Sequence, residues 1–316
     1  MGLFLPDRLL SLSFSGATTG ISLSEESLPE WVMTEENFDE MFTVKKPEPQ
    51  PDSNRLPVVE TTYKSTPEWL ESVAGVAVKN EGDGEFSLSE LVGRLPDFTL
   101  SGLGPQVLIV HTHGSECYKP EGVESYSPDD SFRSENNEEN MVSIGNIVAR
   151  KLEDAGYSVI HDVTLHDKPN FNTSYSSSNA SIRSYMEKYP TIKVVLDLHR
   201  DTLISSNGTK YRPVIDINGT RCAQVMFLMG SGNDTYRHEN WHENLSFALN
   251  IQKTAAEKYP GLMRPVLLQS SRFNQHLCTG GVLVEVGSCG NTHEEAANAA
   301  EYFSDCLIDV LNRLKE

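Results

Sequence analysis

Polar and ionisable residues stand at the ends of apolar, strand-like runs at three places in the sequence. The run Val107–His111 leads into H-T-H-G-S-E (His111–Glu116), Lys193–His199 leads into Arg200 and Asp201, and Val282–Gly287 carries Glu285. A charged side chain in a buried strand costs free energy unless it is paired or coordinated. The three strand ends therefore predict a functional site.

His113 and Glu116 have the spacing H-x-x-E, which lets an imidazole and a carboxylate in one turn reach the same ion. His199, on another strand, can supply a third ligand. Two histidines and one carboxylate with an open fourth position are typical of catalytic zinc. We therefore predict a Zn²⁺ ion held by these side chains. Glu285 would be the general base or acid that faces the metal without binding it.

The opposing interpretation makes each histidine an ordinary hydrogen-bonded core residue, which is the commoner fate of a lone histidine. Four suitable residues at three strand ends favour the metal. His111 leaves an alternative open, because strand parity places it on the same face as His113. It is either the first ligand in place of His113 or a donor that orients Glu116 or the substrate.

Further candidates lie near these strand ends. Arg200 can clamp a substrate carboxylate with two hydrogen bonds, and Asp201 can orient Arg200 or a ligand; a surface ion pair is an equal alternative. Asn274 and Gln275 can line the cleft, although ordinary loop polarity is slightly favoured. Asn291 can hold the loop after Glu285 by bonds from its side chain to the backbone.

The other sequence features argue against rival chemistries. The five cysteines include no C-x-x-C pair, so neither a disulfide framework nor a cysteine-rich zinc site is expected. Cys117 is expected to be a small packed thiol rather than a nucleophile. The net charge of -19 opposes binding of nucleic acid, because phosphates would be repelled.

Strands and helices alternate from Gln106 onward. This alternation predicts an α/β fold with three layers, α/β/α, and a mainly parallel sheet. Ligands in such sheets sit beyond the carboxyl ends of the strands. The expected strands are Val107–His111, Tyr157–Val163, Lys193–His199, Ala223–Met229 and Val282–Gly287, and the expected helices are Asn140–Ala155, Ser178–Lys188, Asn240–Tyr259 and Thr292–Leu314.

Composition divides the chain into three parts. Residues 1–60 are acidic and rich in Pro and Ser, which predicts a tail or linker with one short helix around Pro29–Met41. Residues 61–105 form a lead-in segment with a strand, a turn and the short helix Ser87–Val92. Residues 106–316 form the catalytic domain. The first residues are a poor signal peptide, and no stretch is long and apolar enough to span a membrane.

Several motifs, in this order, resemble the stage II sporulation protein P family of cell-wall hydrolases. They are VKNEGDGEFSLSEL, GPQVLIVHTHGSECY, RSENNEENMVSIGNIV, VLDLHRD, FNQHL and LVEVGSCGNTHEEA. The resemblance covers roughly residues 79–311. It implies a fold similar to that of zinc N-acetylmuramoyl-L-alanine amidases and, more distantly, zinc carboxypeptidases. The carboxypeptidase ligand pattern maps onto His113, Glu116 and His199, and the late glutamate onto Glu285.

The resemblance also implies an activity and a setting. The family cleaves peptidoglycan as an amidase, is credited with endopeptidase cleavage of cross-links, and acts in engulfment with the sporulation proteins D and M. It works outside the cytoplasmic membrane, usually from an N-terminal anchor that is not evident here. Two alternatives stay open: a zinc carboxypeptidase or endopeptidase on another peptide, which an Arg200 clamp would favour, and an inactive wall-binding scaffold.

Overall fold

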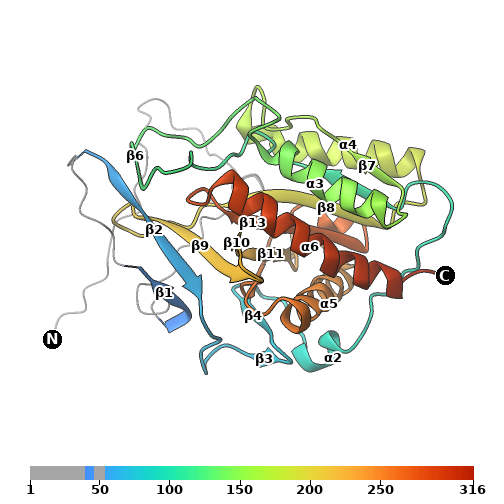
Figure 1. Cartoon of the computed structure of the whole chain (residues 1–316). Coiled ribbons are helices and arrows are strands. Elements are labelled where there is room, and N and C mark those ends of the chain that lie inside the picture. Colours follow the sequence, from blue (N-terminus) through green and yellow to red (C-terminus); the bar gives the residue numbers. More distant parts are fainter. Residues whose placement is uncertain (1–39, 46–53) are drawn as a thin grey trace.

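The computed structural model describes residues 40–45 and 54–316, and its largest element is a sheet of eight strands. The strands lie in the order β3-β4-β12-β11-β13-β8-β5-β7 (Figure 1). Their bounds are β3 (Ser72–Val73), β4 (Val76–Asn80), β5 (Val107–Val110), β7 (Val159–His161), β8 (Val194–Asp201), β11 (Val225–Gly230), β12 (Val266–Gln269) and β13 (Gly280–Ser288).

Most neighbouring strands in this sheet are parallel. Five of the seven pairs are parallel, and only β3–β4 and β11–β13 are antiparallel. The strands β7, β5, β8 and β13 therefore run one way, and β11, β12 and β4 run the other way. The carboxyl ends of β5, β8 and β13 meet at one edge of the sheet, where ligands bind in folds of this kind.

Helices cover both faces of the sheet, which confirms the three-layer α/β fold (Figure 1). On one face α3 (Met141–Asp154), α5 (Trp241–Lys258) and α6 (His293–Arg313) pack on the sheet in the core cluster that includes Val107 and Ile109. On the other face α4 (Ser174–Lys188) packs over Leu108 and Val110. The short helix α2 (Leu88–Val92) contacts α5. Two single-turn 3-10 helices, η1 (Phe171–Thr173) and η2 (Gln275–Leu277), complete the described helices.

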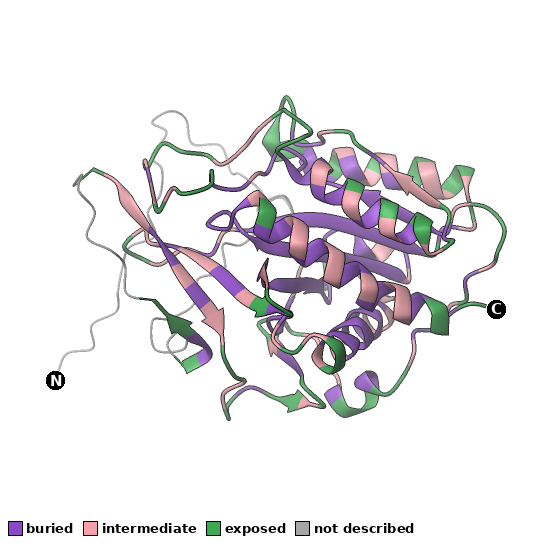
Figure 2. Ribbon diagram, viewed as in Figure 1, coloured by how far each residue is buried: buried purple, intermediate pink, exposed green. Residues whose placement is uncertain are grey.

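The helix and strand signals in the sequence have the expected local causes. Thr292 caps α6 in a reciprocal capping box with Glu295, and Asn140 caps α3 by accepting a bond from the Val142 N–H. Every residue of β8 and of β13 is buried, as their continuous apolar sequences predict (Figure 2). The helix expected to begin at Ser178 begins at Ser174 instead.

A second, smaller sheet was not predicted. It consists of β1 (Phe42–Val44), β2 (Leu56–Tyr63), β9 (Lys210–Ile217) and β10 (Thr220–Ala223) in that order, with β6 (Ser125–Tyr126) paired to β2. The strand β1 and the start of β2 fall within residues 1–60, for which the sequence predicted a tail. The helix predicted around Pro29–Met41 lies almost wholly outside the described residues. The division at residues 60 and 105 stays a prediction.

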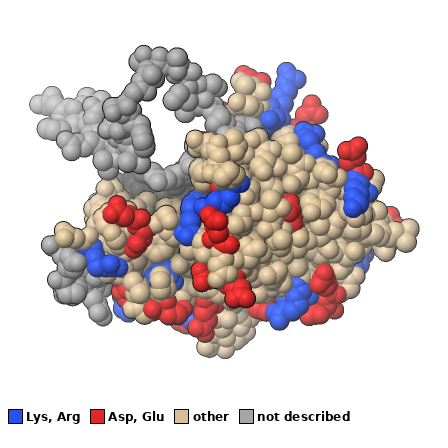
Figure 3. All heavy atoms as spheres, turned by 90° about the horizontal axis from the view of Figure 1, so that it is seen from above, with Lys and Arg blue, Asp and Glu red and all other residues tan. Residues whose placement is uncertain are grey.

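Charged side chains of both signs occur on the surface. Figure 3 shows one face on which basic and acidic side chains lie close together in several places, with uncharged surface between them. On this face the net charge of -19 is therefore not gathered into one acidic patch. None of the helices in the described ranges is long and apolar enough to cross a membrane.

Candidate active site

His113 lies in the turn that follows β5 and is completely buried. Its ring stacks on Phe171 of η1, with centroids 4.4 Å apart and planes at 12°, and meets the edge of Tyr175 of α4. Neither ring nitrogen has a hydrogen-bond partner. Burial lowers the pKa of His113 to about 3, so the ring is neutral and has a free lone pair.

His199 and Glu285 lie side by side on neighbouring parallel strands. The register of β8 and β13 pairs these two residues directly. The His199 ring is perpendicular to that of His113, with centroids 5.3 Å apart. Its Nδ1 lies 3.5 Å from Oε2 of Glu116. The structure thus brings His113, Glu116, His199 and Glu285 together at one end of the sheet, on the face that α4 covers.

Glu116 is a buried, ionised carboxylate. Its Oε2 accepts a 3.2 Å hydrogen bond from the Arg200 backbone N–H, and its Oε1 lies 3.5 Å from Nη2 of Arg133. Burial alone would raise the pKa of Glu116, but Arg200, His199 and His113 hold it well below the usual range. A carboxylate that stays charged inside the protein is suited to binding a cation.

Glu285 is buried in a different electrostatic setting. Burial raises the pKa of its carboxyl to about 8; Asp201 and Glu116 add to this rise, and His199 opposes it. Its Oε2 has no hydrogen-bond partner. A carboxyl with a pKa near neutrality and a free oxygen is suited to proton transfer.

The donors fit a zinc ion in type, although they do not converge on one point. Within residues 40–45 and 54–316, no group of three or more His, Cys, Asp or Glu side chains is arranged to hold a metal ion. Both nitrogens of His113 nevertheless lack partners, and those of His199 make no aligned hydrogen bond. Buried imidazoles are normally hydrogen-bonded. Two imidazoles in this state beside an ionised carboxylate match the zinc donor set.

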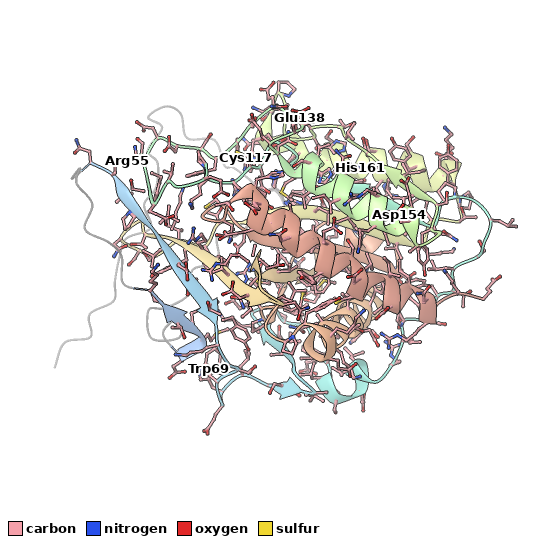
Figure 4. All side chains as sticks on the ribbon, viewed as in Figure 1. Arg55, Trp69, Cys117, Glu138, Asp154 and His161 are labelled. Carbon is pink, nitrogen blue, oxygen red and sulfur yellow. The ribbon has the colours of Figure 1, made fainter. Side chains whose placement is uncertain are left out.

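A pocket adjoins the site on its outer side. It has a volume of ≈ 840 Å³, and its lining includes Cys117, Phe132, Arg133 and Glu138. Cys117 and Glu138 lie near the start of α3 (Figure 4). Arg133 lines this pocket and also contacts Glu116, so the pocket lies next to the predicted ligand.

The expectation that His111 shares a face with His113 is wrong. The strand β5 ends at Val110, and the turn that follows sends the two rings to opposite sides of the sheet. His111 points toward Gly145 of α3, and both of its nitrogens are engaged, by the Leu198 carbonyl at 3.1 Å and His161 at 2.8 Å. It therefore has no free nitrogen for a ligand role.

Arg200 is not available as a substrate clamp. Its side chain is buried, and its three nitrogens donate to the carbonyls of Cys117 and Phe132 and to the Thr202 hydroxyl. Asp201 does not orient it, because Oδ2 of Asp201 accepts a 2.8 Å bond from the buried Arg264. The Arg200 side chain thus ties together the backbone at Cys117, the loop at Phe132 and Thr202 just after β8, next to Glu116.

The three amide side chains are structural in their contacts. Gln275 is buried and bonds the Leu228 carbonyl and the Gly230 N–H at the end of β11, so it does not line the cleft. Asn274 donates to the Tyr175 carbonyl and the Ser178 hydroxyl of α4. Asn291 accepts from the Ser288 N–H and donates to the Pro213 carbonyl, which holds the loop after β13.

Several residues that surround the site were not predicted from the sequence. Asp197 of β8 has Oδ1 2.9 Å from Nε2 of His199, outside the direction of a hydrogen bond. Burial lowers the pKa of His199, but Asp197 and Glu116 raise it well above its usual value. Arg133 lies over the Phe171 ring at 4.6 Å and pairs with Asp167 at 2.9 Å. Only Asp197, a charge inside an apolar run, carried a sequence signal.

Comparison with known proteins identifies the family. The family described as Stage II sporulation protein P matches residues 6–308. The chain belongs to this family. It is 28% identical over 219 residues to the stage II sporulation protein P of Bacillus subtilis (strain 168), a match that covers 65% of this chain and 51% of that protein. The chain thus spans about half the length of this curated relative of the stage II sporulation protein P family.

Solved structures give weaker likenesses. The N-acetylmuramoyl-L-alanine amidase AmiC2 of Nostoc punctiforme is 12% identical with a TM-score of 0.40, covering 66% of this chain and 96% of the amidase. The catalytic domain of the amidase CwlV from Bacillus (Paenibacillus) polymyxa var. colistinus is 14% identical with a TM-score of 0.40. The match covers 66% of this chain and 97% of the CwlV domain. Membership of the stage II sporulation protein P family rests on the sequence match alone.

Proposed function

We propose that this protein is a zinc-dependent cell-wall hydrolase that cleaves the amide between N-acetylmuramic acid and the stem peptide. The observation that carries the proposal is the gathering of His113, Glu116, His199 and Glu285 at one end and on one face of the sheet. Buried imidazoles without aligned hydrogen bonds, an ionised carboxylate and a carboxyl of raised pKa are the groups that metal-assisted amide hydrolysis needs.

His113, Glu116 and His199 would hold the zinc ion. When bound, the ion would polarise the scissile carbonyl and lower the pKa of the attacking water. The chain itself supplies two further conditions. Burial of His113 keeps its imidazole neutral, so a lone pair is available at neutral pH. Arg200, with His199 and His113, holds the pKa of Glu116 below its usual range and so keeps it charged at the position where a cation would bind.

Glu285 would move the proton in this reaction. Its carboxylate would accept a proton from the attacking water as the oxygen–carbon bond forms, and would return it to the nitrogen as the carbon–nitrogen bond breaks. The position of Glu285 beside His199 in the strand register supports this role. Its unpartnered Oε2 gives the proton an acceptor that no other group of the protein occupies.

Family membership supports the biological setting of this proposal. The substrate would be peptidoglycan, with endopeptidase cleavage of cross-links as a second activity. The protein would act in engulfment during sporulation, together with the sporulation proteins D and M. It would work outside the cytoplasmic membrane, where peptidoglycan lies.

Two other functions remain as outcomes of the test. A zinc carboxypeptidase would need a cation free to bind a terminal carboxylate, and the engagement of Arg200 with Cys117, Phe132 and Thr202 argues against Arg200 in that role. An inactive wall-binding scaffold would not need a buried, unpartnered carboxyl such as Glu285, which costs free energy.

The test is the release of new amino and reducing ends from purified peptidoglycan. We expect the wild-type protein to release amino ends without reducing ends, and expect chelation and His199→Ala each to abolish the release. His242→Ala, at a half-buried histidine whose ring contacts the Glu85 carbonyl rather than the site, should retain full activity. Mass analysis of the fragments distinguishes amidase from endopeptidase products.

The other outcomes are decisive as well. Full activity after complete removal of metal would contradict the zinc proposal. A metal-loaded protein that releases nothing would favour the scaffold. Because His199 is buried, thermal unfolding of His199→Ala is measured in parallel, and Glu285→Gln gives an independent inactive variant.

A further inference from the structure

A chain of buried polar groups connects the two predicted histidine ligands, and its centre is Asp197. This carboxylate is 4% exposed and faces α4 from the middle of β8. Its Oδ1 lies 2.9 Å from Nε2 of His199 and accepts a 2.8 Å hydrogen bond from the Thr112 N–H. Thr112 is the residue immediately before His113. One carboxylate therefore contacts one predicted ligand and the backbone neighbour of the other.

The direction of the bonds follows from the available hydrogens. Thr112 Oγ1 lies 2.6 Å from Oδ2 of Asp197 and 2.7 Å from Oγ of Ser178. A carboxylate only accepts, so the single Thr112 hydroxyl hydrogen goes to Asp197. The Ser178 hydroxyl hydrogen then has two acceptors, Thr112 Oγ1 at 2.7 Å and the Tyr175 carbonyl at 3.3 Å, and Thr112 is the nearer. The Asn274 side-chain amide in turn donates to Ser178 at 3.0 Å. The contacts thus run from Asn274, at the start of η2, through Ser178 of α4 and Thr112 to Asp197.

The arrangement also fixes which side of the His199 ring remains open. Asp197 lies at Nε2, and Nδ1 lies on the side of Glu116, 3.5 Å from its Oε2. Thr112 binds Asp197 through both its backbone and its hydroxyl. The turn carrying His113 is thereby tied to the strand that carries His199.

We propose that Asp197 is a positioning residue that orients His113 and His199 together for metal binding, and that Thr112 transmits this effect. This inference rests on the proposed function, because it assumes that the two histidines bind zinc. Carboxylates that hold the far nitrogen of a metal-binding histidine fix its ring and increase its basicity. Here a single carboxylate would act on both rings, through Thr112 on His113 and directly on His199. The Asp197–His199 contact is close but not aligned as a hydrogen bond, and the ring would complete this bond when its other nitrogen binds the ion.

The experiment measures the zinc dissociation constant of the full chain by competition with a chromophoric chelator. Asp197→Asn keeps the size of the side chain and loses its charge, so we expect zinc binding about 10- to 100-fold weaker. Thr112→Val removes the hydroxyl and should weaken binding in the same direction. Thr112→Ser keeps the hydroxyl and should bind zinc as the wild type does.

A matched control is available elsewhere in the molecule. Asp162 is also a buried carboxylate beside a histidine, with Oδ2 3.3 Å from Nε2 of His166. Asp162→Asn should leave the zinc dissociation constant unchanged. The absorption spectrum of the cobalt-substituted protein gives a second readout: Asp197→Asn should alter the ligand-field bands, and Asp162→Asn should not.

The outcomes separate this inference from the proposed function. If Asp197→Asn and Thr112→Val bind zinc as tightly as the wild type while His199→Ala does not bind, the positioning role is wrong and the zinc site stands. If the wild-type protein itself binds no zinc, the proposed function fails first. Thermal unfolding in the presence of chelator shows whether each variant is folded. If Asp197→Asn does not fold, Thr112→Val still tests the inference.

Discussion

At the scale of single residues, the site combines groups that oppose folding. Glu285 is buried, has a carboxyl pKa of about 8 and has one oxygen without a partner. Its ionised form pays a desolvation cost that no hydrogen bond offsets. Valines flank it on β13 and face the opposite, helix-covered side of the sheet. The same strand thus supplies core stability from one face and a buried carboxyl of raised pKa from the other.

This contrast predicts separate effects of two substitutions on β13. Glu285→Gln should lower hydrolysis at least about 100-fold, because the proton acceptor is lost, and should leave the melting temperature unchanged or raise it. Val284→Ala should instead lower stability by about 2 kcal/mol through lost buried methyl groups and keep activity below the melting transition. Hydrolysis assays and thermal unfolding check both. Unchanged hydrolysis in Glu285→Gln would contradict the role given to this residue.

At the scale of elements, strand ends were predictable and side-chain partners were not. A charged residue in an apolar run is visible in the sequence, which is why Glu285 and His199 were found. The face that His111 takes depends on where β5 ends, and a single residue of extension reverses it. Arg133 reaches Glu116 from a loop with no periodicity. Such contacts arise only from tertiary packing.

The pair His111–His161 joins the turn after β5 to β7 and predicts a response to acid. Nδ1 of His111 donates to the Leu198 carbonyl, so its Nε2 accepts from Nε2–H of His161. Burial lowers the pKa of His111 to about 3 and that of His161 to about 4. In the unfolded chain both imidazoles bind protons as the pH falls below about 6.5. In the folded chain the same two imidazoles are still neutral at that pH. Stability should therefore fall as the pH drops from about 6.5 to about 4.

His161→Gln tests this response, because glutamine can donate to His111 without titrating. We expect the melting temperature of the wild type to fall by several degrees between pH 7.5 and pH 5, and that of His161→Gln to fall less. His242→Gln is the control, since His242 lies outside this pair. An equal fall in all three proteins would contradict the assignment.

At the scale of the whole molecule, the two sheets differ in how far the sequence predicts them. Main-sheet strands such as β8 and β13 are continuous apolar runs, whereas β2 and β9 are partly buried, carry charges and contain Pro57 and Pro213. Their parallel pairing joins distant parts of the chain, and no local pattern encodes it. The three-layer domain was therefore predicted and the smaller sheet was missed.

Asn291 connects the two sheets and gives the last prediction. It is completely buried, accepts from Ser288 N–H of β13 at 2.9 Å, and donates to the Pro213 carbonyl of β9 at 3.1 Å and to Glu295 of α6 at 2.9 Å. Asn291→Ala would remove three buried hydrogen bonds and leave the Ser288 N–H without its partner, at a cost of about 3 kcal/mol. The Pro213 carbonyl keeps its bond from the Gln224 N–H, and Glu295 keeps its bond from the Thr292 N–H. The melting temperature should fall by about 5–10 °C, in one transition if the sheets unfold together.

The control is Asn298→Ala. It loses one bond to the Arg221 carbonyl in a half-buried position and should cost less than about 1 kcal/mol. Two separate transitions in Asn291→Ala would show instead that the smaller sheet unfolds independently.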